Sequence, residues 1–454
     1  MPQAIGRMLN RGIAVLRNMK SGLIYTAGTL ASVVASVPVH AQAPAPMVAV
    51  ASPGIAAAPD VVAAYDTLRI QPIWVRGGVE SPAVAQLVAI LQRAPFDGFA
   101  EGPQLAAQVT AAAAQARAAP ATAASADRII SSAWVRYVQA LKRPTKGMIY
   151  AYPVLRPQGI RTEEILLTTA AAPSLTAYLT ATSDLNPIYR QLRDTAWAEG
   201  QAMSNLTPDP RLLANLDRAR SIPGRGRFVL VDSGTQRLTL FENAVPVDSM
   251  KIIVGTNELP TPLIASMMYY VTYNPYWHAP DMLVKKTIAP NVLRMGPKYL
   301  SSRGYHVVDA WSETANVVDA ATVDWKAAAA GTSHVFVRQD PGPLNSMGNL
   351  KFPFPNPEGI YLHDTPSKQH FAKNLRNLSN GCVRVEDAKR LARWLIGQEP
   401  AAPSADPEIR VQLPQGVPVV LTYLTAQVQD GKLTYLNDFY GWDTNGPPRF
   451  ASSD

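Results

Sequence analysis

Hydrophobic positions follow two different periods along this chain, and the change falls near residue 223. In the N-terminal half the apolar residues recur at helical spacing. The clearest predicted helix covers residues 126–141, with Ser125 as its candidate N-cap. Its apolar face comprises Ile130, Trp134, Val138 and Leu141. Asn186 followed by Pro187 predicts a second helix start, because an N-cap residue and a first-turn proline favour one.

After residue 223 the pattern alternates with period two, which predicts strands. The expected strands cover residues 227–232, 236–241, 247–254, 267–273, 334–338, 359–363 and 417–424. The residues Ser233-Gly234-Thr235 lie between the first two and predict a hairpin. A last helix is expected over residues 388–396, where apolar residues share one face and Gly397 follows as the stop. The sequence therefore predicts an α+β fold, with an N-terminal helical scaffold domain followed by a mainly β domain.

The length of 454 residues exceeds one ordinary hydrophobic core, so more than one domain is expected. We divide the chain into a signal peptide (1–41), an Ala/Pro-rich linker (42–60), a helical scaffold domain (61–222) and the mainly β domain (223–450), in which the candidate chemistry described below lies. Within the last, residues 275–333 form a long insertion between strands. A loop of this length in a compact domain usually has a function, so we expect a lid over a site.

The first 41 residues have the composition of an export signal. Four basic residues, Arg7, Arg11, Arg17 and Lys20, precede an uncharged and mostly apolar stretch that ends in Val39-His40-Ala41. This pattern predicts a protein exported to the periplasm, and an uncleaved leader would instead give contact with the inner membrane. Without those four residues the formal net charge falls from +8 to +4. A net charge of this size gives no indication of nucleic-acid binding, and the chain has no run of basic residues interleaved with aromatic ones.

The only cysteine of the chain, Cys382, stands in Ser379-Asn380-Gly381-Cys382-Val383-Arg384. An exported protein with one cysteine has no internal disulfide, so a structural disulfide does not explain why the chain has a thiol. The glycine before it lets a substrate approach the backbone, and Arg384 after it supplies positive charge. The predicted helix over 388–396 begins a few residues later, and its N-terminus is expected to favour the thiolate.

An acyl-transferring cysteine needs a base, a group that orients the base, and donors for the oxyanion. His363, at a predicted strand end, is the candidate base. A backbone carbonyl within residues 364–366 and the Asp364 carboxylate are both candidate orienting groups. Backbone N–H groups around Asn380, Gly381 and Cys382 are the candidate oxyanion donors.

The other histidines are weaker candidates for the base. His370 lies on a polar stretch, and His278, His306 and His334 are isolated in sequence. No pair of residues has the spacing of a metal motif, so neither a metal nor another cofactor is expected.

The segments YLHDTP and SNGCVRV together resemble the YkuD-type L,D-transpeptidases, in which a histidine is followed by a spacer and Ser/Thr-x-Gly-Cys-x-Asn/Arg. RFVLVD, KIIVGT, YNPYW and KFPFPNP are also similar to the large Gram-negative members. The resemblance implies that Cys382 is the nucleophile and His363 its base. It implies further that Ser379, Gly381 and Arg384 shape the oxyanion pocket and the substrate contacts, with Tyr361 and Trp277 as further groove candidates.

Two features depart from that family pattern. Many smaller members carry a histidine directly before the glycine, where this chain has Asn380. Larger members often insert a peptidoglycan-binding module, and residues 197–207 are too short to hold one.

The resemblance implies an enzyme that acts on peptidoglycan stem peptides, forms 3-3 cross-links through a cysteine thioester, and is acylated by carbapenems. An L,D-carboxypeptidase, a lipoprotein-anchoring enzyme or a transpeptidase of another linkage would use the same chemistry. A papain-like or amidase-like peptidase and a non-catalytic wall-binding protein are the remaining alternatives.

Overall fold

The computed structural model describes residues 56–76, 79–312 and 314–448. The predicted signal peptide and residues 42–55 of the predicted linker lie outside the described residues. The first helix begins at Pro59, so the last two residues of the predicted linker, Pro59 and Asp60, belong to helix α1 instead.

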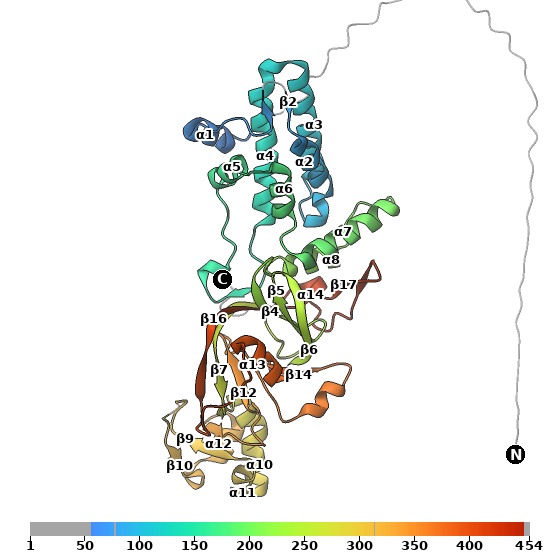
Figure 1. The fold of residues 1–454 in the computed structure, drawn as a ribbon. Coiled ribbons are helices and arrows are strands. Elements are labelled where there is room, and N and C mark those ends of the chain that lie inside the picture. Colours follow the sequence, from blue (N-terminus) through green and yellow to red (C-terminus); the bar gives the residue numbers. More distant parts are fainter. Residues whose placement is uncertain (1–55, 77–78, 313, 449–454) are drawn as a thin grey trace, which may run out of the picture. The chain divides into compact units, whose positions relative to one another are not determined.

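The N-terminal region is built from helices that surround α4 (Figure 1). Helix α4 (Ala123–Leu141) buries all four residues of the predicted apolar face. It begins before the expected N-cap Ser125, because the 3-10 turn η2 (Pro120–Thr122) leads directly into it. The other helices are α1 (Pro59–Leu68), α2 (Pro82–Arg93), α3 (Gly102–Ala118), α5 (Thr162–Ala170), α6 (Leu175–Ser183), α7 (Pro187–Ala202) and α8 (Pro210–Ala219). Asn186 caps α7 as predicted, since its side chain accepts a hydrogen bond from the Tyr189 N–H.

The C-terminal region contains a ten-stranded sheet with the strand order β12-β13-β15-β6-β5-β4-β16-β7-β3, and β14 pairs with β6. An additional pairing of β12 with β7 closes the path of hydrogen-bonded strands on itself. The strands are β3 (Ile149–Tyr150), β4 (Arg227–Asp232), β5 (Arg237–Glu242), β6 (Val245–Gly255), β7 (Ile264–Tyr273), β12 (Leu350–Pro353), β13 (Tyr361–His363), β14 (Asn377–Ser379), β15 (Val383–Val385) and β16 (Ile409–Thr422).

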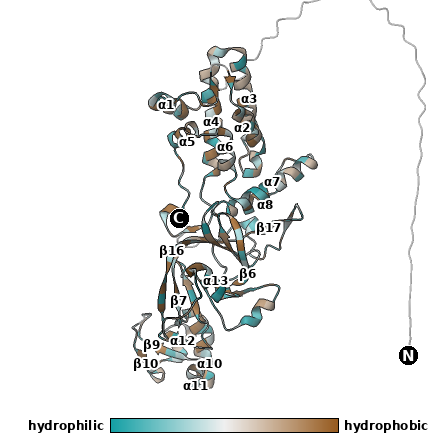
Figure 2. Ribbon diagram, in the orientation of Figure 1, coloured by the Kyte–Doolittle hydropathy of each residue, from teal (hydrophilic) through white to brown (hydrophobic). Residues whose placement is uncertain are grey.

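The inner face of this sheet forms one hydrophobic core with the last helix. Helix α13 (Ala388–Ile396) buries five apolar residues in the same cluster as the strand residues. Asp387 caps its start, and Gly397 ends it in the left-handed conformation at the predicted stop. Figure 2 shows apolar residues, in brown, on both the helices and the strands of the protein.

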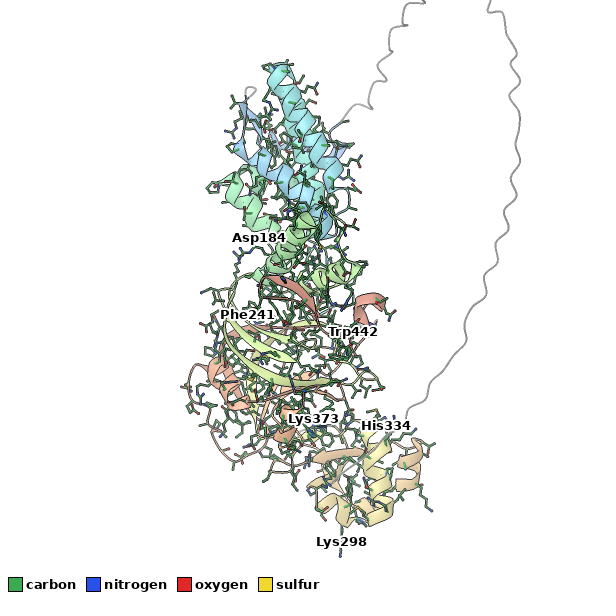
Figure 3. All side chains as sticks on the ribbon, turned by 90° about the vertical axis from the view of Figure 1, so that its right-hand side faces the viewer. Asp184, Phe241, Lys298, His334, Lys373 and Trp442 are labelled. Atoms are coloured by element: carbon green, nitrogen blue, oxygen red, sulfur yellow. The ribbon has the colours of Figure 1, made fainter. Side chains whose placement is uncertain are left out.

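The predicted insertion is a small folded lobe rather than a loop. Its strands β8 (Trp277–His278), β9 (Tyr305–Val308), β10 (Val317–Val318) and β11 (Phe336–Gln339) form a separate sheet of order β10-β9-β11-β8. Its helical segments are α9 (Asp281–Leu283), the π-helical turn η4 (Val284–Ile288), α10 (Ala289–Met295), α11 (Lys298–Ser301), η5 (Ala320–Thr322) and α12 (Trp325–Ala330). Strand β11, expected in the main sheet, therefore belongs to this lobe, which we call the insertion lobe (residues 277–339). Figure 3 labels Lys298 and His334 within it.

The helical region and the sheet share contacts. Strand β3, which follows α4 in the chain, pairs in parallel with β7. Asn215 on α8 accepts hydrogen bonds from the N–H groups of Thr425 and Ala426, which lie just after β16. A hairpin of β17 (Ala426–Gln429) and β18 (Lys432–Tyr435) and the short helix α14 (Trp442–Asn445) complete the described chain.

Candidate active site

Two parallel strands bring the predicted nucleophile and base together. Strands β13 and β15 pair Leu362 with Val383 and His363 with Arg384. Leu362 and Val383 are fully buried in the inner core. Because side chains alternate along a strand, Tyr361 and His363, together with Cys382 and Arg384, share the opposite face.

A backbone carbonyl orients the imidazole of His363. The Nδ1 atom lies 2.6 Å from the Asp364 carbonyl oxygen. A carbonyl oxygen only accepts, so Nδ1 carries the proton and the lone pair is on Nε2. The Asp364 carboxylate instead accepts from Lys368 Nζ at 2.7 Å and from the Asn349 N–H at 3.1 Å. The sequence left two candidate orienting groups open, and in the structure the Asp364 backbone carbonyl orients the ring.

His363 is 5% exposed, and burial lowers its pKa to about 3. The positive charge of Arg384, its partner in the strand register, lowers this pKa further. An imidazole in this setting is neutral at physiological pH, which is the protonation state that a general base needs.

The Cys382 thiol is protonated in the resting site. Burial raises its pKa, although hydrogen bonds from the backbone N–H and the hydroxyl of Tyr361 act in the opposite direction, as do the charges of Lys351 and Arg384. Burial therefore outweighs the groups that favour the thiolate here, and the effect of the helix N-terminus stays a prediction. Strand β15 lies between Cys382 and α13 along the chain.

The thiol donates to the Gly359 carbonyl oxygen, with a sulfur–oxygen distance of 3.8 Å. In the described residues no hydrogen bond joins the Cys382 sulfur to the His363 ring. Donation of the thiol proton to Nε2 therefore requires the hydrogen bond to Gly359 to be broken first. Catalytic hydrogen bonds often form only once substrate is bound.

Residues of the motif hold the turn before the nucleophile. Ser379 Oγ donates to the Cys382 carbonyl at 2.5 Å and accepts from the Gly381 N–H at 3.3 Å. Gly381 has φ of 109°, and a Cβ there would lie 3.1 Å from Ile360 Cδ1. Thr261 Oγ1 donates to the Gly381 carbonyl at 2.7 Å. Asn380 is exposed at the tip of this turn.

Tyr361 connects the base, the nucleophile and a nearby lysine. Its ring meets the His363 ring edge to face, with centroids 5.7 Å apart. The Lys351 ammonium lies 4.7 Å from the Tyr361 ring centroid, a cation–π contact. Burial and the proximity of Cys382 raise the pKa of Tyr361 well above its usual value, so its hydroxyl remains a donor to the sulfur.

Arg384 is a cation without a hydrogen-bond partner among the described residues. Its Nε atom is buried and unpartnered, and burial lowers the pKa of its guanidinium. A guanidinium has five donors in a planar fork that matches a carboxylate. Arg384 is therefore available to a carboxylate of a substrate bound over Cys382.

Trp277 is placed in the insertion lobe rather than beside Cys382. It pairs with Gln339 in the lobe sheet and contacts the Tyr305 ring at 6.1 Å between centroids. A cavity of about 200 Å³ lies between the lobe and the outer face of the main sheet. Its lining residues are His278, Trp311 and Ser312 from the lobe and Tyr270, Thr272, Lys351, Pro353, Glu408 and Arg410 from the sheet and the adjoining segment.

Comparison with protein families decides the identity of both regions. Residues 226–420 match the model of the L,D-transpeptidase catalytic domain, YkuD, and residues 59–195 match that of a scaffold domain. The chain contains a YkuD L,D-transpeptidase domain. The resemblance of the HDTP and GCVRV segments is thus confirmed at the level of the family, and so is the helical scaffold before the catalytic domain.

A putative L,D-transpeptidase of Haemophilus influenzae is 28% identical over 321 residues. That match covers 68% of this chain and 64% of the relative, so this chain spans less than two thirds of the relative's length. Among solved structures, an L,D-transpeptidase from Mycobacterium smegmatis is 12% identical with a TM-score of 0.23, covering 44% of this chain and 60% of that one. A mutant L,D-transpeptidase from Enterococcus faecium is 11% identical with a TM-score of 0.22, covering 43% and 50%.

The remaining histidines of the YkuD-like region have other surroundings. His306 pairs with Asp340 and His334 with Asp281, both at 3.0 Å, and His370 lies on the 3-10 turn η6 (Lys368–Ala372). The described residues hold no cluster of three or more His, Cys, Asp or Glu side chains suited to a metal ion. In the same part of the chain no helix is long and apolar enough to cross a membrane.

Several residues near the site were missed by sequence reasoning. Lys351 and Thr261 lie close to the candidate catalytic pair through strand pairing and a tight turn. Arg410, on strand β16, and Glu408, just before that strand, line the cavity on the same sheet face. Only Lys351 carried a sequence signal, because it belongs to the KFPFPNP segment that resembles the family.

Proposed function

We propose that this protein is a peptidoglycan L,D-transpeptidase of the periplasm, in which Cys382 is the nucleophile and His363 its general base. The observation that supports this most directly is the common sheet face of Cys382, His363, Tyr361 and Arg384, set by the β13–β15 register within the YkuD domain. The donor is a tetrapeptide stem, and the attacked carbonyl belongs to the L-centre of its third residue, a diaminopimelate. The scaffold domain and the insertion lobe hold the polymer and cover the site.

In the first step the thiol turns from the Gly359 carbonyl to Nε2 of His363. The imidazole takes the thiol proton as the sulfur forms a bond to the donor carbonyl carbon, and the carbonyl oxygen becomes an oxyanion. When the oxyanion collapses, the peptide bond to the terminal D-alanine breaks and the imidazolium gives its proton to the leaving amine. The product is a thioester on Cys382 and free D-alanine.

The Tyr361 hydroxyl is the side-chain donor for the oxyanion in this proposal, because it already donates to the Cys382 sulfur. The Gly381 N–H is less suitable, since it donates to Ser379 Oγ. The Cys382 backbone N–H is the second donor.

Substrate charge assists the base. Arg384 and Lys351 lower the pKa of His363, which makes the imidazolium intermediate costly in the free enzyme. A stem carboxylate bound beside these cations offsets their charge and raises the pKa of His363. The base therefore becomes more effective when the anionic donor is bound.

In the second step an amine of a neighbouring stem attacks the thioester, His363 accepts the amine proton, and the thiol leaves. The new amide joins two third-position residues, which is a 3-3 cross-link. No cofactor is required, because the thioester conserves the energy of the broken peptide bond. Water as acceptor would give an L,D-carboxypeptidase, a lipoprotein lysine would give protein anchoring, and another donor carbonyl would give another linkage.

Purified disaccharide-tetrapeptide tests the proposal directly. The protein should release D-alanine and form dimers whose linkage is read by mass spectrometry, and carbapenems should add to Cys382. Cys382→Ala should abolish both reactions, whereas His370→Gln, a histidine on η6, should retain them. Release of D-alanine by Cys382→Ala would overturn the assignment of Cys382 as the nucleophile. A wild-type protein that binds the wall without any reaction would indicate a non-catalytic wall-binding protein.

A further inference from the structure

A residue outside the matched catalytic domain contacts the loop beside the turn of residues 379–382, which we call the nucleophile turn. The YkuD match ends at residue 420, whereas Tyr440 follows the β17–β18 hairpin. The Tyr440 hydroxyl donates to the Gly255 carbonyl oxygen at 2.7 Å and accepts from the Thr261 N–H at 3.2 Å. Burial raises the pKa of Tyr440 to about 12, so the hydroxyl keeps its proton at physiological pH. Tyr440 therefore joins the two ends of the loop from Gly255 to Thr261, which follows β6.

The side chain of Thr261 continues this network to the nucleophile turn. Its hydroxyl accepts from the Gly255 N–H at 2.9 Å and donates to the Gly381 carbonyl oxygen at 2.7 Å. Thr261 is buried, so these hydrogen bonds are shielded from solvent. The Thr256 N–H also donates to the Ser379 carbonyl oxygen at 2.9 Å. The loop therefore holds the nucleophile turn through one side chain and through its backbone.

The peptide group between Gly381 and Cys382 is the end point of this network. A peptide group is planar, so the orientation of its carbonyl fixes the orientation of its N–H. The carbonyl belongs to Gly381 and accepts from Thr261, and the N–H belongs to Cys382. Hydrogen bonds in a chain polarise one another, so a bonded carbonyl makes the N–H of the same group a stronger donor. Thr261 therefore sets both the direction and the strength of the Cys382 N–H.

Tyr440 is itself held by the C-terminal segment, residues 438–445. Its ring packs against the rings of Tyr423, Phe439 and Trp442, with centroids 5.0, 4.5 and 4.8 Å apart. Figure 3 labels Trp442 of this segment. The Tyr440 N–H donates to the Tyr423 hydroxyl at 3.2 Å. The ring and the backbone of Tyr440 are thus both fixed by contacts other than those of its hydroxyl.

Helix α8 anchors the C-terminal segment through one buried carboxylate. Asp443 accepts from the Asn215 amide at 3.2 Å and from the Thr425 hydroxyl at 2.6 Å. It also forms an ion pair with Arg218, and both side chains are buried. Because a buried charge pair is costly to break, the segment is firmly attached at this point. Tyr440 therefore approaches the loop from a fixed support.

We infer that Tyr440 is a positioning residue for the acyl transfer, and that it acts through Thr261 on the peptide group between Gly381 and Cys382. The inference rests on the proposed function, in which the Cys382 N–H is a donor to the oxyanion. Among the described residues, Tyr440 has no hydrogen bond or ring contact with Cys382 or His363. The oxyanion carries its charge only during the reaction, so the network lowers the barrier without changing the binding of the stem.

Tyr440→Phe tests the inference, because it keeps the aromatic packing and removes only the hydroxyl. The readout is single-turnover acylation of Cys382 by disaccharide-tetrapeptide, followed by intact-protein mass spectrometry. The maximal rate should fall about tenfold, while the stem concentration that gives half of it stays unchanged. A wild-type maximal rate in Tyr440→Phe would overturn the inference.

Tyr137→Phe is the matched control. The Tyr137 hydroxyl is buried on α4 and donates to Asp97 at 2.9 Å, outside the network. This variant should lose stability in thermal unfolding but keep the wild-type rate of acylation. An equal fall in its rate would show that lost stability, rather than lost positioning, explains Tyr440→Phe, and would contradict the inference.

Variants of Thr261 test the same network one step closer to the nucleophile. Thr261→Val removes the hydroxyl and should lower the maximal rate about 10- to 100-fold, whereas Thr261→Ser keeps the hydroxyl and should lose much less. Tyr440→Phe added to Thr261→Val should cause little further loss, because Tyr440 acts through Thr261. Full losses from both substitutions in the double variant would contradict that connection.

Alkylation of Cys382 by iodoacetamide separates donor positioning from damage to the thiol, since alkylation forms no oxyanion. Its rate should be unchanged in Tyr440→Phe and in Thr261→Val. A change in alkylation that parallels the change in acylation would contradict the inference. If thermal unfolding shows that Tyr440→Phe does not fold, Thr261→Val and Thr261→Ser decide, and equal acylation by these two would overturn the inference. If no stem acylates Cys382 in the wild-type protein, the proposed function itself fails.

Discussion

The imidazole of His363 is held by the backbone of the next residue, with Nδ1 2.6 Å from the Asp364 carbonyl oxygen. Catalytic histidines in other enzymes are often held by a carboxylate, which also stabilises the imidazolium. Here the Asp364 carboxylate points to Lys368 and to the Asn349 N–H instead. The proposed base is therefore oriented by a neutral group that no side-chain substitution removes.

Asp364→Asn should consequently be a mild substitution. Nδ1 keeps its partner, and the lost ion pair with Lys368 involves a half-exposed lysine, where such pairs contribute about 1 kcal/mol or less. We expect the rate of Cys382 acylation to fall no more than about tenfold. In enzymes where a carboxylate orients the base, losing that carboxylate lowers the rate by about 10⁴-fold. His363→Gln, measured in parallel, should lower the rate by about 10³ or more. A loss of that size in Asp364→Asn would show that the carboxylate takes part.

In the free enzyme, the rate of acylation should not fall near pH 6.5, where an ordinary histidine becomes protonated. Burial lowers the pKa of His363 to about 3, below the ordinary 6.5, so the base stays unprotonated as pH falls from 7 to 5. The profile of kcat/KM, which reports the free enzyme, should therefore be flat across that interval. The profile of kcat should decline at higher pH than that of kcat/KM, because a bound stem carboxylate raises the pKa of His363. Coincident limbs near pH 6.5 in both profiles would contradict this.

The same shift links His363 to stability. The unfolded chain binds a proton on this histidine below pH 6.5, whereas the folded protein binds it only near pH 3. The free energy of unfolding should therefore decrease as pH falls from 6.5 toward 3, by at most about 1.4 kcal/mol per pH unit from this group. His363→Gln should show a shallower dependence in denaturant titrations at pH 7, 6 and 5. Parallel curves for the two proteins would show that His363 titrates normally in the fold.

Tyr361→Phe should separate the hydroxyl from the ring. The substitution keeps the packing against His363 and removes the hydrogen bond that lowers the thiol pKa. Alkylation of Cys382 by iodoacetamide, followed against pH, should give a higher thiol pKa in the variant. Acylation by the stem should fall about 10- to 100-fold if the hydroxyl also donates to the oxyanion. An unchanged thiol pKa would remove Tyr361 from the site chemistry.

Much of the fold could be predicted because local patterns specify it. Strand β4 and helix α13 match the residues expected from their apolar spacing, and Gly397 ends the helix in the left-handed conformation. Strand β16 begins at Ile409, earlier than expected, because Pro414 and Gly416 resemble a loop where the structure has an irregular register. A bulge of this kind depends on the partner strand and leaves no periodic signal.

The sequence predicted only those residues of the candidate site that lie together in one short segment. Cys382 and His363 stand in recognisable motifs, and their residue types suggest their roles. The row of directly paired residues across the sheet from His363 to Arg410 depends on the pairing of four strands that are far apart in the sequence. The protonation state was also beyond sequence reasoning, since it depends on burial, which raises the thiol pKa.

Gly381→Ala tests whether the geometry of the turn matters for the reaction. The positive φ of 109° costs an alanine about 1–2 kcal/mol, and its Cβ would press on Ile360 at 3.1 Å. Gly397 is a matched control, since it has φ of 83° at the end of α13 and open space around its Cβ position. Both variants should lose stability in thermal unfolding, and Gly381→Ala should lose more because of its contact with Ile360. Only Gly381→Ala should slow Cys382 acylation, by about tenfold or more, because it displaces the proposed nucleophile. Equal acylation rates in the two variants would mean that Gly381 serves the fold alone.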